Sequence, residues 1–289
     1  MAEAREQESI SYRVFVGNVT LHVLEWTGEG TPLVLAHPTG FLGAIWRPIV
    51  TRLRTAGFSG RIIAFDQRGH GLSSKPDTGY EWPRFVEDAQ GLLCEIDVRA
   101  AVGVGHSAGA TTLAGVAARD PQRIRRLLMI DPILFDPEIG AVVRGGDNAM
   151  AARTRTRRLV WSSREELFSS FRTREPYDTW TDEALRIYVE HGTFDRPDGE
   201  IELLCPGRIE AQVYQNSASM DVFGDLRELD IPVTLVRGEH SLSFPAGRAQ
   251  QALGCLRHGR LISVPKAGHF LPMEFPDRTV ELILAELGA

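Results

Sequence analysis

The chain has 289 residues, of which 43% are hydrophobic and 24% are charged, as in an ordinary soluble globular protein. This length is enough for one large domain, or for one domain that carries an insertion. The formal net charge is −6, so there is no electrostatic reason to expect nucleic acid or an anionic membrane as a partner.

The cysteines and the N-terminal segment bear on the compartment. Cys94, Cys205 and Cys255 lie far apart and form no Cys-x-x-Cys pair, so we expect free thiols and neither a disulfide framework nor a zinc site. The segment Met1–Ser9 lacks the apolar core of a signal peptide, and no apolar run approaches membrane-spanning length. We expect a cytoplasmic protein that uses no metal and no organic cofactor.

In the first half of the chain, strand patterns alternate with helix patterns. Apolar, β-type runs predict strands at Ser11–Val16, Thr20–Trp26, Pro32–Ala36, Arg61–Phe65, Ala100–Val104 and Arg126–Ile130. Helical spacing predicts helices at Ala44–Ala56, Trp82–Ile96 and Ala110–Arg119. This alternation favours a parallel sheet that is covered by helices on both faces.

The pattern changes at about Phe135. From there to Gly224 the sequence has no strand signal and is helical and polar, with helices predicted at Ser162–Phe171 and Asp182–His191. Beyond Ile231 the alternation resumes, with strands at Pro232–Val236 and Arg260–Val264 and helices at Pro245–Leu253 and Asp277–Leu287. We therefore expect a core of residues 1–134 and 225–289, interrupted by a helical cap over residues 135–224.

Residues 102–109 read Val-Gly-Val-Gly-His-Ser-Ala-Gly, an apolar strand that runs through G-x-S-x-G into a helix. In such a turn the serine has a strained backbone, and glycines are needed because side chains there would collide with the strand and the helix. The hydroxyl of Ser107 would lie near the first N–H groups of the helix, which stabilise negative charge. The motif predicts a nucleophile; the alternative is a tight turn with a bystander serine.

Four landmarks occur in a fixed order along the chain: His37-Pro38-Thr39-Gly40, Asp66-Gln67-Arg68-Gly69-His70-Gly71, Gly105-His106-Ser107-Ala108-Gly109 and Gly268-His269. With them, residues 10 to 289 resemble the α/β-hydrolase fold superfamily, in particular its esterase- and lactonase-like branch with a serine nucleophile and a helical cap. The resemblance implies a mostly parallel eight-stranded sheet flanked by helices, with the cap inserted between strands 6 and 7. Fold alone does not confer activity.

The resemblance also implies roles for residues of these landmarks. His269, in the loop after the last strand, would be the base that takes the proton of Ser107. The backbone N–H groups of Ala108 and Thr39 would form the oxyanion hole; Pro38 replaces the usual glycine, but the donor is the N–H of the next residue. Five residues are expected to line the substrate pocket: His37, Phe41, His106, Trp161 and Tyr188.

The acid of the site is where the sequence departs most from the family. Most members carry an aspartate a few residues beyond the seventh strand, and here that place holds Ser241, which cannot balance the charge of an imidazolium. Asp131, directly after the sixth strand, is the preferred acid, and Glu239 is the second choice. The remaining alternatives are that Asp131 only caps the following turn, or that the site has no working acid.

A serine, a histidine and an acid beside an oxyanion hole support acyl transfer, in which water finally hydrolyses an acyl-enzyme. We expect a serine hydrolase for an ester or lactone of a small to medium, largely hydrophobic molecule. A carbon–carbon bond hydrolase of the same fold and a non-catalytic ligand-binding homologue are the alternatives. The arginines of Arg153–Arg158 are expected on a solvated helix face rather than at an acidic substrate. The expected partner is the small-molecule substrate, and a homodimer is possible.

Overall fold

The computed structural model describes residues 9–135 and 148–288 of the chain. Residues 1–8, on which the expected absence of a signal peptide rests, and residues 136–147, at the start of the expected cap, lie outside the described residues. The described part of the chain holds no helix with both the length and the apolar character of a membrane span.

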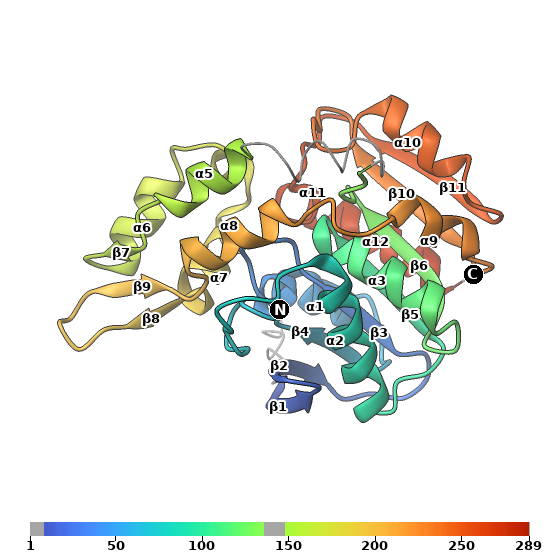
Figure 1. Cartoon of the computed structure of the whole chain (residues 1–289), viewed down its shortest axis with the longest axis horizontal. Helices are drawn as coiled ribbons and strands as arrows, with labels where there is room; N and C mark the ends of the chain where they lie inside the picture. Colours follow the sequence, from blue (N-terminus) through green and yellow to red (C-terminus); the bar gives the residue numbers. More distant parts are fainter. Residues whose placement is uncertain (1–8, 136–147, 289) are drawn as a thin grey trace.

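Eight strands of the described residues form one sheet, in the order β1-β2-β4-β3-β5-β6-β10-β11 (Figure 1). Their bounds are β1 (Ile10–Val16), β2 (Val19–Trp26), β3 (Leu33–Ala36), β4 (Ile62–Phe65), β5 (Ala101–His106), β6 (Ile124–Ile130), β10 (Val233–Gly238) and β11 (Gly259–Val264). The pairs β1–β2 and β2–β4 are antiparallel, and the other neighbouring pairs are parallel. The predicted mostly parallel, eight-stranded sheet is confirmed.

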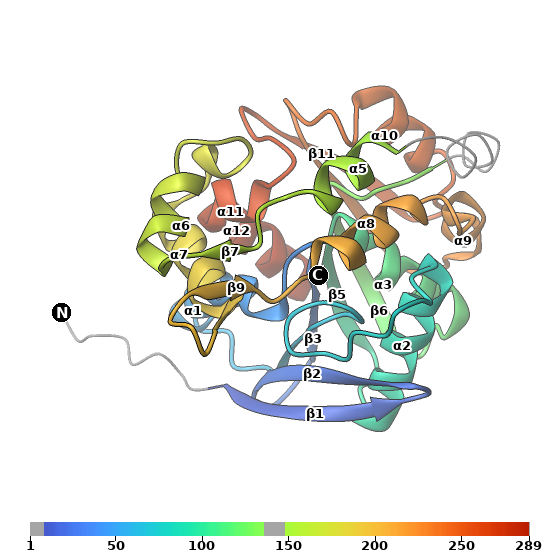
Figure 2. The same cartoon turned by 60° about the vertical axis from the view of Figure 1, so that its left-hand side comes forward.

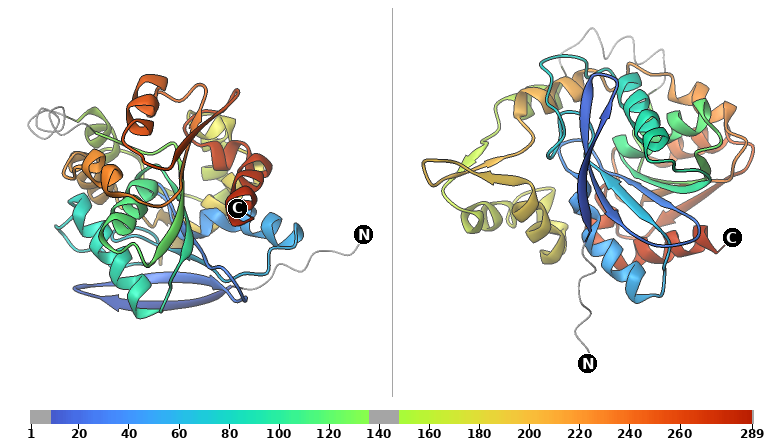
Figure 3. Two further views of the ribbon diagram at one scale, coloured as in Figure 1. Left: turned by 90° about the vertical axis from the view of Figure 1, so that its right-hand side faces the viewer. Right: turned by 90° about the horizontal axis from the view of Figure 1, so that it is seen from below.

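Helices cover both faces of this sheet (Figure 3). One layer contains α1 (Arg47–Thr55) and α12 (Pro276–Leu287), and the other contains α2 (Trp82–Glu95), α3 (Ala108–Arg119), α9 (Val222–Glu228) and α10 (Ala246–Leu253). The short helices η1 (Gly43–Trp46) and α11 (Leu271–Glu274) precede α1 and α12. Because side chains alternate across a strand, Leu33 and Leu35 of β3 pack with the first layer, whereas Val34 and Ala36 pack with the second.

Between β6 and β10, the sixth and seventh strands of this sheet in chain order, lies the segment that we call the cap. Its described elements are α5 (Ala149–Arg155), β7 (Val160–Trp161), α6 (Arg164–Phe171), η2 (Tyr177–Thr179), α7 (Asp182–His191), β8 (Thr193–Asp195), β9 (Ile201–Leu203) and α8 (Gly207–Gln215). These elements gather on one side of the molecule, where α8 lies next to α5, and α7 contacts η1 and α1 of the core (Figures 1 and 2).

The cap also contains a small antiparallel sheet in the order β7-β9-β8, so the expectation of a region without strands is wrong. These strands have two or three residues each, which is too few for the alternation that predicts a strand. The two helices predicted here are present, and each has a side-chain cap. Ser163 accepts the N–H of Glu166 at 3.1 Å at the start of α6, and Thr181 accepts the N–H of Ala184 at 3.2 Å at the start of α7.

The turn between β5 and α3 depends on a close backbone contact. Gly109, the second residue of α3, lies against the end of β3: a Cβ atom there would be 2.3 Å from the carbonyl oxygen of Ala36 and 2.6 Å from that of His37. No side chain fits at these distances, so glycine is what allows the start of α3 to meet the loop after β3. This contact brings the G-x-S-x-G turn next to the loop of residues 37–40.

The substitution Gly109→Ala tests this contact. The added Cβ would push α3 away from β3, so we expect the free energy of unfolding to fall by roughly 3 kcal/mol. The matched control is Gly247→Ala in α10, where an added Cβ meets nothing within 4 Å and should raise that free energy by up to about 1 kcal/mol. Urea unfolding followed by circular dichroism measures both. Equal stabilities of the two variants would contradict the close contact.

Candidate active site

Ser107 lies between β5 and α3 with a φ of +56°, in the left-handed region that strains a residue with a side chain. Its N–H donates to the carbonyl oxygen of Ile130 at 2.9 Å, which fixes the turn against the end of β6. Ala108 is the first residue of α3, so the helix supplies no acceptor for its N–H. A hydroxyl and an available N–H donor therefore stand next to each other at this turn.

Ser107, His269 and Asp131 form one chain of hydrogen bonds. Ser107 Oγ lies 3.1 Å from His269 Nε2, and His269 Nδ1 lies 2.6 Å from Asp131 Oδ1. A carboxylate only accepts hydrogen bonds, so in the neutral ring Nδ1 carries the proton and Nε2 is able to accept the proton of Ser107. The side chain of Asp131 is fully buried and that of His269 is 19% exposed, so the ring, and not the acid, is open to solvent.

Asp131 is held by the neighbouring strand. The N–H of Gly238 donates to Oδ2 at 3.0 Å, and the hydroxyl of Ser241 donates to Oδ1 at 2.6 Å. Glu239, the second candidate acid, is exposed and accepts a backbone N–H of the loop after β11 at 2.9 Å. Of the two candidate acids, Asp131 is the one that contacts His269.

The loop after β3 forms a tight turn close to Ser107. The N–H of Phe41 donates to the carbonyl oxygen of Pro38 at 3.3 Å, and Gly40, the third residue of this turn, has a φ of +87°, as a type II turn requires. The turn bond leaves the N–H of Thr39, one of the two predicted oxyanion donors, unused. The loop therefore holds Thr39 near the start of α3 without consuming its donor.

Three buried histidines lie around this chain of hydrogen bonds. Burial lowers the pKa of His37, lowers that of His106 still further, and lowers that of His70 to about 3, so all three rings are neutral near neutral pH. A neutral ring is a fixed donor and acceptor. His37 Nε2 accepts the N–H of Gln67 at 3.0 Å, and His106 Nε2 donates to the carbonyl oxygen of His269 at 2.7 Å. Both rings thereby fix the backbone of the loops around the site.

Aromatic rings from the cap and the core meet over the loop after β3. The ring centroid of Phe41 lies 4.8 Å from that of Tyr188 and 5.3 Å from that of Trp180, both in the cap. It also lies 5.7 Å from that of Phe270, the residue after His269. The predicted pocket residues Phe41 and Tyr188 therefore belong to one apolar group that includes Phe270, whose ring lies 4.9 Å from that of His269.

Trp161, also predicted to line the substrate pocket, lies within the cap. Its ring packs edge-on against Phe171 with centroids 5.6 Å apart, and the guanidinium of Arg158 lies 3.9 Å from its ring centroid. The residue is 2% exposed. These contacts make Trp161 a member of the core of the cap itself.

The four arginines between residues 153 and 158 do not share one environment. Arg153, Arg155 and Arg158 are exposed, as expected for a solvated face. Arg157 instead turns inward, with its side chain 20% exposed, and pairs with Glu210 of α8 at 2.8 Å. The interpretation of the run as a solvated face is therefore wrong for Arg157.

Glu210 brings this ion pair to the loop after β3. Its Oε1 would be 2.6 Å from a Cβ atom placed on Gly40, so the glycine gives the carboxylate room. Burial raises the pKa of the Glu210 carboxyl, although the charge of Arg157 opposes that rise. Burial also acts on Arg157, but the pKa of its guanidinium is raised because Glu210 and Tyr188 lie beside it. Arg157 thus stays cationic inside the cap.

Two of these residues are missed by sequence reasoning. Glu210 stands between the apolar residues Ile209 and Ala211, and a lone acid in such a segment is a signal that could have indicated a buried partner. Ser241 is recognised in the sequence only as the place of a missing acid. Its bond to Asp131 depends on the adjacency of β6 and β10, for which the sequence has no local pattern.

A second chain of the same residue types lies at the edge of the sheet. Ser11 Oγ is 2.9 Å from His22 Nε2, and His22 Nδ1 is 2.8 Å from Asp66 Oδ2. Ser11 lies inside the regular strand β1, and the chain after it continues as a strand. Ser11 does not precede a helix, in contrast to Ser107, so a serine–histidine–aspartate chain of hydrogen bonds does not by itself predict a nucleophile.

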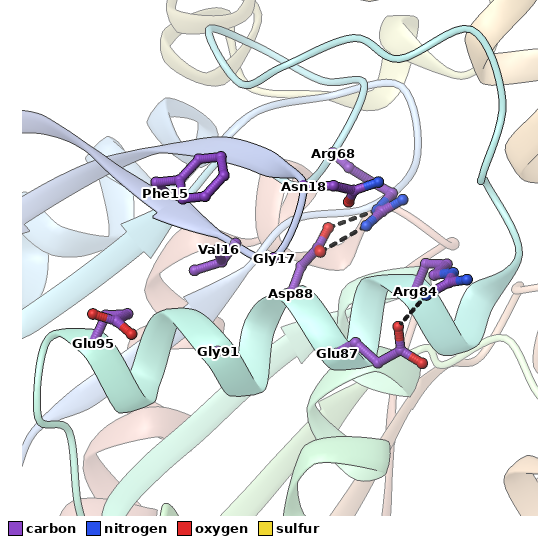
Figure 4. A pocket seen from close by; sticks show the side chains of 10 residues that line it. All are labelled: Phe15, Val16, Gly17, Asn18, Arg68, Arg84, Glu87, Asp88, Gly91 and Glu95. Carbon is purple, nitrogen blue, oxygen red and sulfur yellow. Dashed lines mark hydrogen bonds and ion pairs between the residues drawn. The ribbon is translucent and has the colours of Figure 1, made fainter.

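A groove of about 550 Å³ lies between the β1–β2 hairpin and α2, and its lining includes none of the residues of the Ser107 chain (Figure 4). Its lining residues are Phe15, Val16, Gly17, Asn18, Arg68, Arg84, Glu87, Asp88, Gly91 and Glu95. Charged side chains there pair with each other, Arg68 with Asp88 at 2.6 Å and Arg84 with Glu87 at 2.9 Å. Across the described ranges, no three His, Cys, Asp or Glu side chains are grouped as a metal ion would need.

Residues 33–282 match the family model described as "Alpha/beta hydrolase family". The 2-(acetamidomethylene)succinate hydrolase of Mesorhizobium japonicum is 30% identical over 287 residues, which cover 98% of this chain and 96% of that protein. The crystal structure of E-2-(acetamidomethylene)succinate hydrolase, also 30% identical, has a TM-score of 0.85 and covers 98% of this chain and 100% of its own. The enol-lactonase from Burkholderia xenovorans LB400 shares the fold at 19% identity, with a TM-score of 0.73 over 96% of this chain and 100% of its own.

Proposed function

The chain belongs to the alpha/beta hydrolase family, and on this premise we propose that it is a serine hydrolase that cleaves an ester or lactone through an acyl-enzyme. The observation that carries the proposal is the chain of hydrogen bonds from Ser107 through His269 to Asp131, at 3.1 Å and 2.6 Å. A serine, a histidine and a carboxylate in this order, next to backbone N–H donors, are the groups that acyl transfer requires.

In the first half of the proposed reaction, Ser107 Oγ attacks the carbonyl carbon of the substrate while His269 Nε2 takes the hydroxyl proton. The carbonyl π electrons move to oxygen, and the N–H groups of Ala108 and Thr39 donate to this oxyanion. The carbonyl then re-forms as the alcohol oxygen leaves with the proton from His269, and Ser107 keeps the acyl group. Asp131 holds the ring in place and balances its positive charge.

In the second half, a water molecule takes the place of the alcohol. His269 removes a proton from the water, whose oxygen attacks the acyl carbon, and the bond to Ser107 Oγ breaks as the proton returns to the serine. Because His37 and His106 are buried and neutral, His269 is the ring that exchanges this proton. A lactone follows the same steps, except that the leaving alcohol stays tethered to the acyl group.

A fluorophosphonate probe tests whether Ser107 is the nucleophile. We expect full labelling of the wild-type protein, none in Ser107→Ala, and a large loss in His269→Ala because the base is removed. Ser11→Ala is the matched control, because Ser11 also adjoins a His–Asp pair but does not stand at the start of a helix; its labelling should equal that of the wild type. Mass spectrometry of the digested protein gives the labelled residue. Labelling that persists in Ser107→Ala would refute the assignment.

The variants Asp131→Asn and Glu239→Gln separate the two candidate acids. We expect Asp131→Asn to lower kcat on a nitrophenyl ester about 10⁴-fold, because a neutral amide neither holds the ring proton nor balances the imidazolium. Glu239→Gln should leave kcat near the wild-type value, because this exposed side chain accepts the N–H of Lys266 and not a proton of His269. Initial rates measure both effects, and circular dichroism checks that both variants fold. The reverse pattern would make Glu239 the acid.

We further propose that the substrate carries a carboxylate as well as an apolar part. The relative that is 30% identical is named for a substituted succinate, a molecule with two carboxylates. In this chain Arg157 lies inside the cap, and its partner Glu210 reaches the loop that contains Thr39. Arg157 also donates to the carbonyl oxygen of Cys205 at 3.0 Å, and because a guanidinium has five N–H donors, these two partners still leave donors for a second carboxylate. The apolar part of the substrate would lie against the rings of Phe41 and Tyr188.

A pair of esters that differ in charge tests the role of Arg157. We expect Arg157→Gln to raise KM for nitrophenyl hydrogen succinate at least about tenfold, because a charged hydrogen bond is lost, and to change KM for nitrophenyl butyrate little. Arg155→Gln, at an exposed position of α5, is the matched control and should change neither. Steady-state kinetics on both esters give the comparison. An equal rise of KM for the two esters would contradict a role in binding a carboxylate.

A further inference from the structure

Ser241 stands where most members of the family carry their acid, yet it contacts the acid that this chain has. The strands β6 and β10 are parallel neighbours, with Ile130 paired with Val236. Their carboxyl ends therefore lie at one edge of the sheet. Asp131, after β6, and Ser241, in the turn after β10, reach the same point from two strands.

The hydroxyl of Ser241 is fixed from both sides. It accepts the N–H of Phe244 at 3.3 Å and donates to Asp131 Oδ1 at 2.6 Å, and the residue is 4% exposed. The same Oδ1 accepts the Nδ1 proton of His269 at 2.6 Å. Two donors on one carboxylate oxygen fix the direction of its lone pairs, and short bonds to an ionised acceptor are among the strongest hydrogen bonds in proteins.

The rest of the turn after β10 also holds Asp131. The N–H of Gly238 donates to Oδ2 at 3.0 Å, and the N–H of Asp131 donates to the carbonyl oxygen of Val236 at 2.7 Å. Asp131 has a φ of +44°, which an aspartate tolerates but which needs support from its surroundings. Besides His269, the carboxylate of Asp131 thus accepts from Gly238 at the end of β10 and from Ser241 in the turn that follows it.

We propose that Ser241 is a positioning residue that acts through Asp131, and that the place it occupies is still able to hold the acid of the site. The Ser241 hydroxyl keeps Oδ1 of Asp131 directed at Nδ1 of His269, and this in turn keeps Nε2 directed at Ser107. The kinetic part of this inference rests on the proposed hydrolase function, whereas the geometric part does not.

The first experiment removes the hydroxyl. Ser241→Ala should lower kcat on the nitrophenyl ester about 10- to 100-fold, as when a hydrogen-bond partner of a functional side chain is lost, with KM unchanged because Ser241 does not touch the substrate. Ser241→Thr keeps the hydroxyl and should recover most of the loss. Ser243→Ala, at an exposed position of the same turn, is the matched control. A change confined to KM in Ser241→Ala, or no change at all, would overturn the assignment.

The second experiment moves the acid from one strand to the other. Ser241→Asp alone brings two carboxylates together in a buried place, so we expect lower activity and a lower Tm. In the double variant Asp131→Asn/Ser241→Asp, the new amide donates to the new carboxylate, which lies where the family keeps its acid. We expect kcat of the double variant to be at least about tenfold above that of either single variant. If the double variant folds but is no more active than the better single variant, the inference that position 241 is able to hold the acid is wrong.

A proton NMR experiment separates this inference from the proposed function. The Nδ1 proton of His269, shared with Asp131, should give a far-downfield resonance that is lost in Asp131→Asn, displaced in Ser241→Ala and unchanged in Ser243→Ala. This readout needs no substrate. A protein without esterase activity that shows the displacement would keep the role of Ser241 and reject the proposed function. An unchanged resonance in Ser241→Ala would reject the role of Ser241.

Discussion

The direction of one imidazole ring is the constraint on which the site depends. His269 can take a proton from Ser107 only when Nε2 faces the hydroxyl, and the 2.6 Å bond from Nδ1 to Asp131 sets that direction. The backbone of His269 is fixed as well, because its carbonyl oxygen accepts the Nε2 proton of His106 at 2.7 Å. Since His106 directly precedes Ser107, two adjacent residues contact His269, one at its backbone and one at its ring.

Parallel strands supply this geometry because their carboxyl ends meet at one edge of the sheet. Ser107 follows β5 and Asp131 follows β6, both at positive φ, +56° and +44°, so the chain bends sharply after each strand. A hydrogen bond to the adjacent strand stabilises each of these strained residues. The N–H of Ser107 donates to the carbonyl oxygen of Ile130 of β6, and that of Asp131 donates to the carbonyl oxygen of Val236 of β10. Ser107 and Asp131 are therefore each held by the strand next to their own.

The same dependence on neighbours explains what the sequence predicts and what it does not. The core strands and helices are long enough for their periodicity to be read, and the motifs single out Ser107 and His269 locally. The sequence also favours Asp131 over Glu239, because Asp131 directly follows an apolar strand, but the contact of Asp131 with His269 is seen only in the structure, in which β6 lies between β5 and β10. In the cap, strands of two or three residues have no readable period. The four arginines of residues 153–158 look alike in the sequence, so the sequence does not predict that Arg157 is the one that points into the cap. Its partner there, Glu210, lies on α8, more than fifty residues further along the chain.

Both the cap and the core contribute residues around the site, but the groups proposed to transfer protons belong to the core. The cap reaches the loop after β3 through Tyr188, whose ring lies 4.8 Å from that of Phe41. It reaches the segment after His269 through the N–H of Thr181, which donates to Met273 at 3.0 Å. A polar side chain of the cap takes part as well: the hydroxyl of Thr179 donates to Glu274 at 3.2 Å, and Glu274 accepts the N–H of Gly268, next to His269, at 2.6 Å. The groups proposed to move protons all come from the core, so a change in the polarity of the cap would remove none of them.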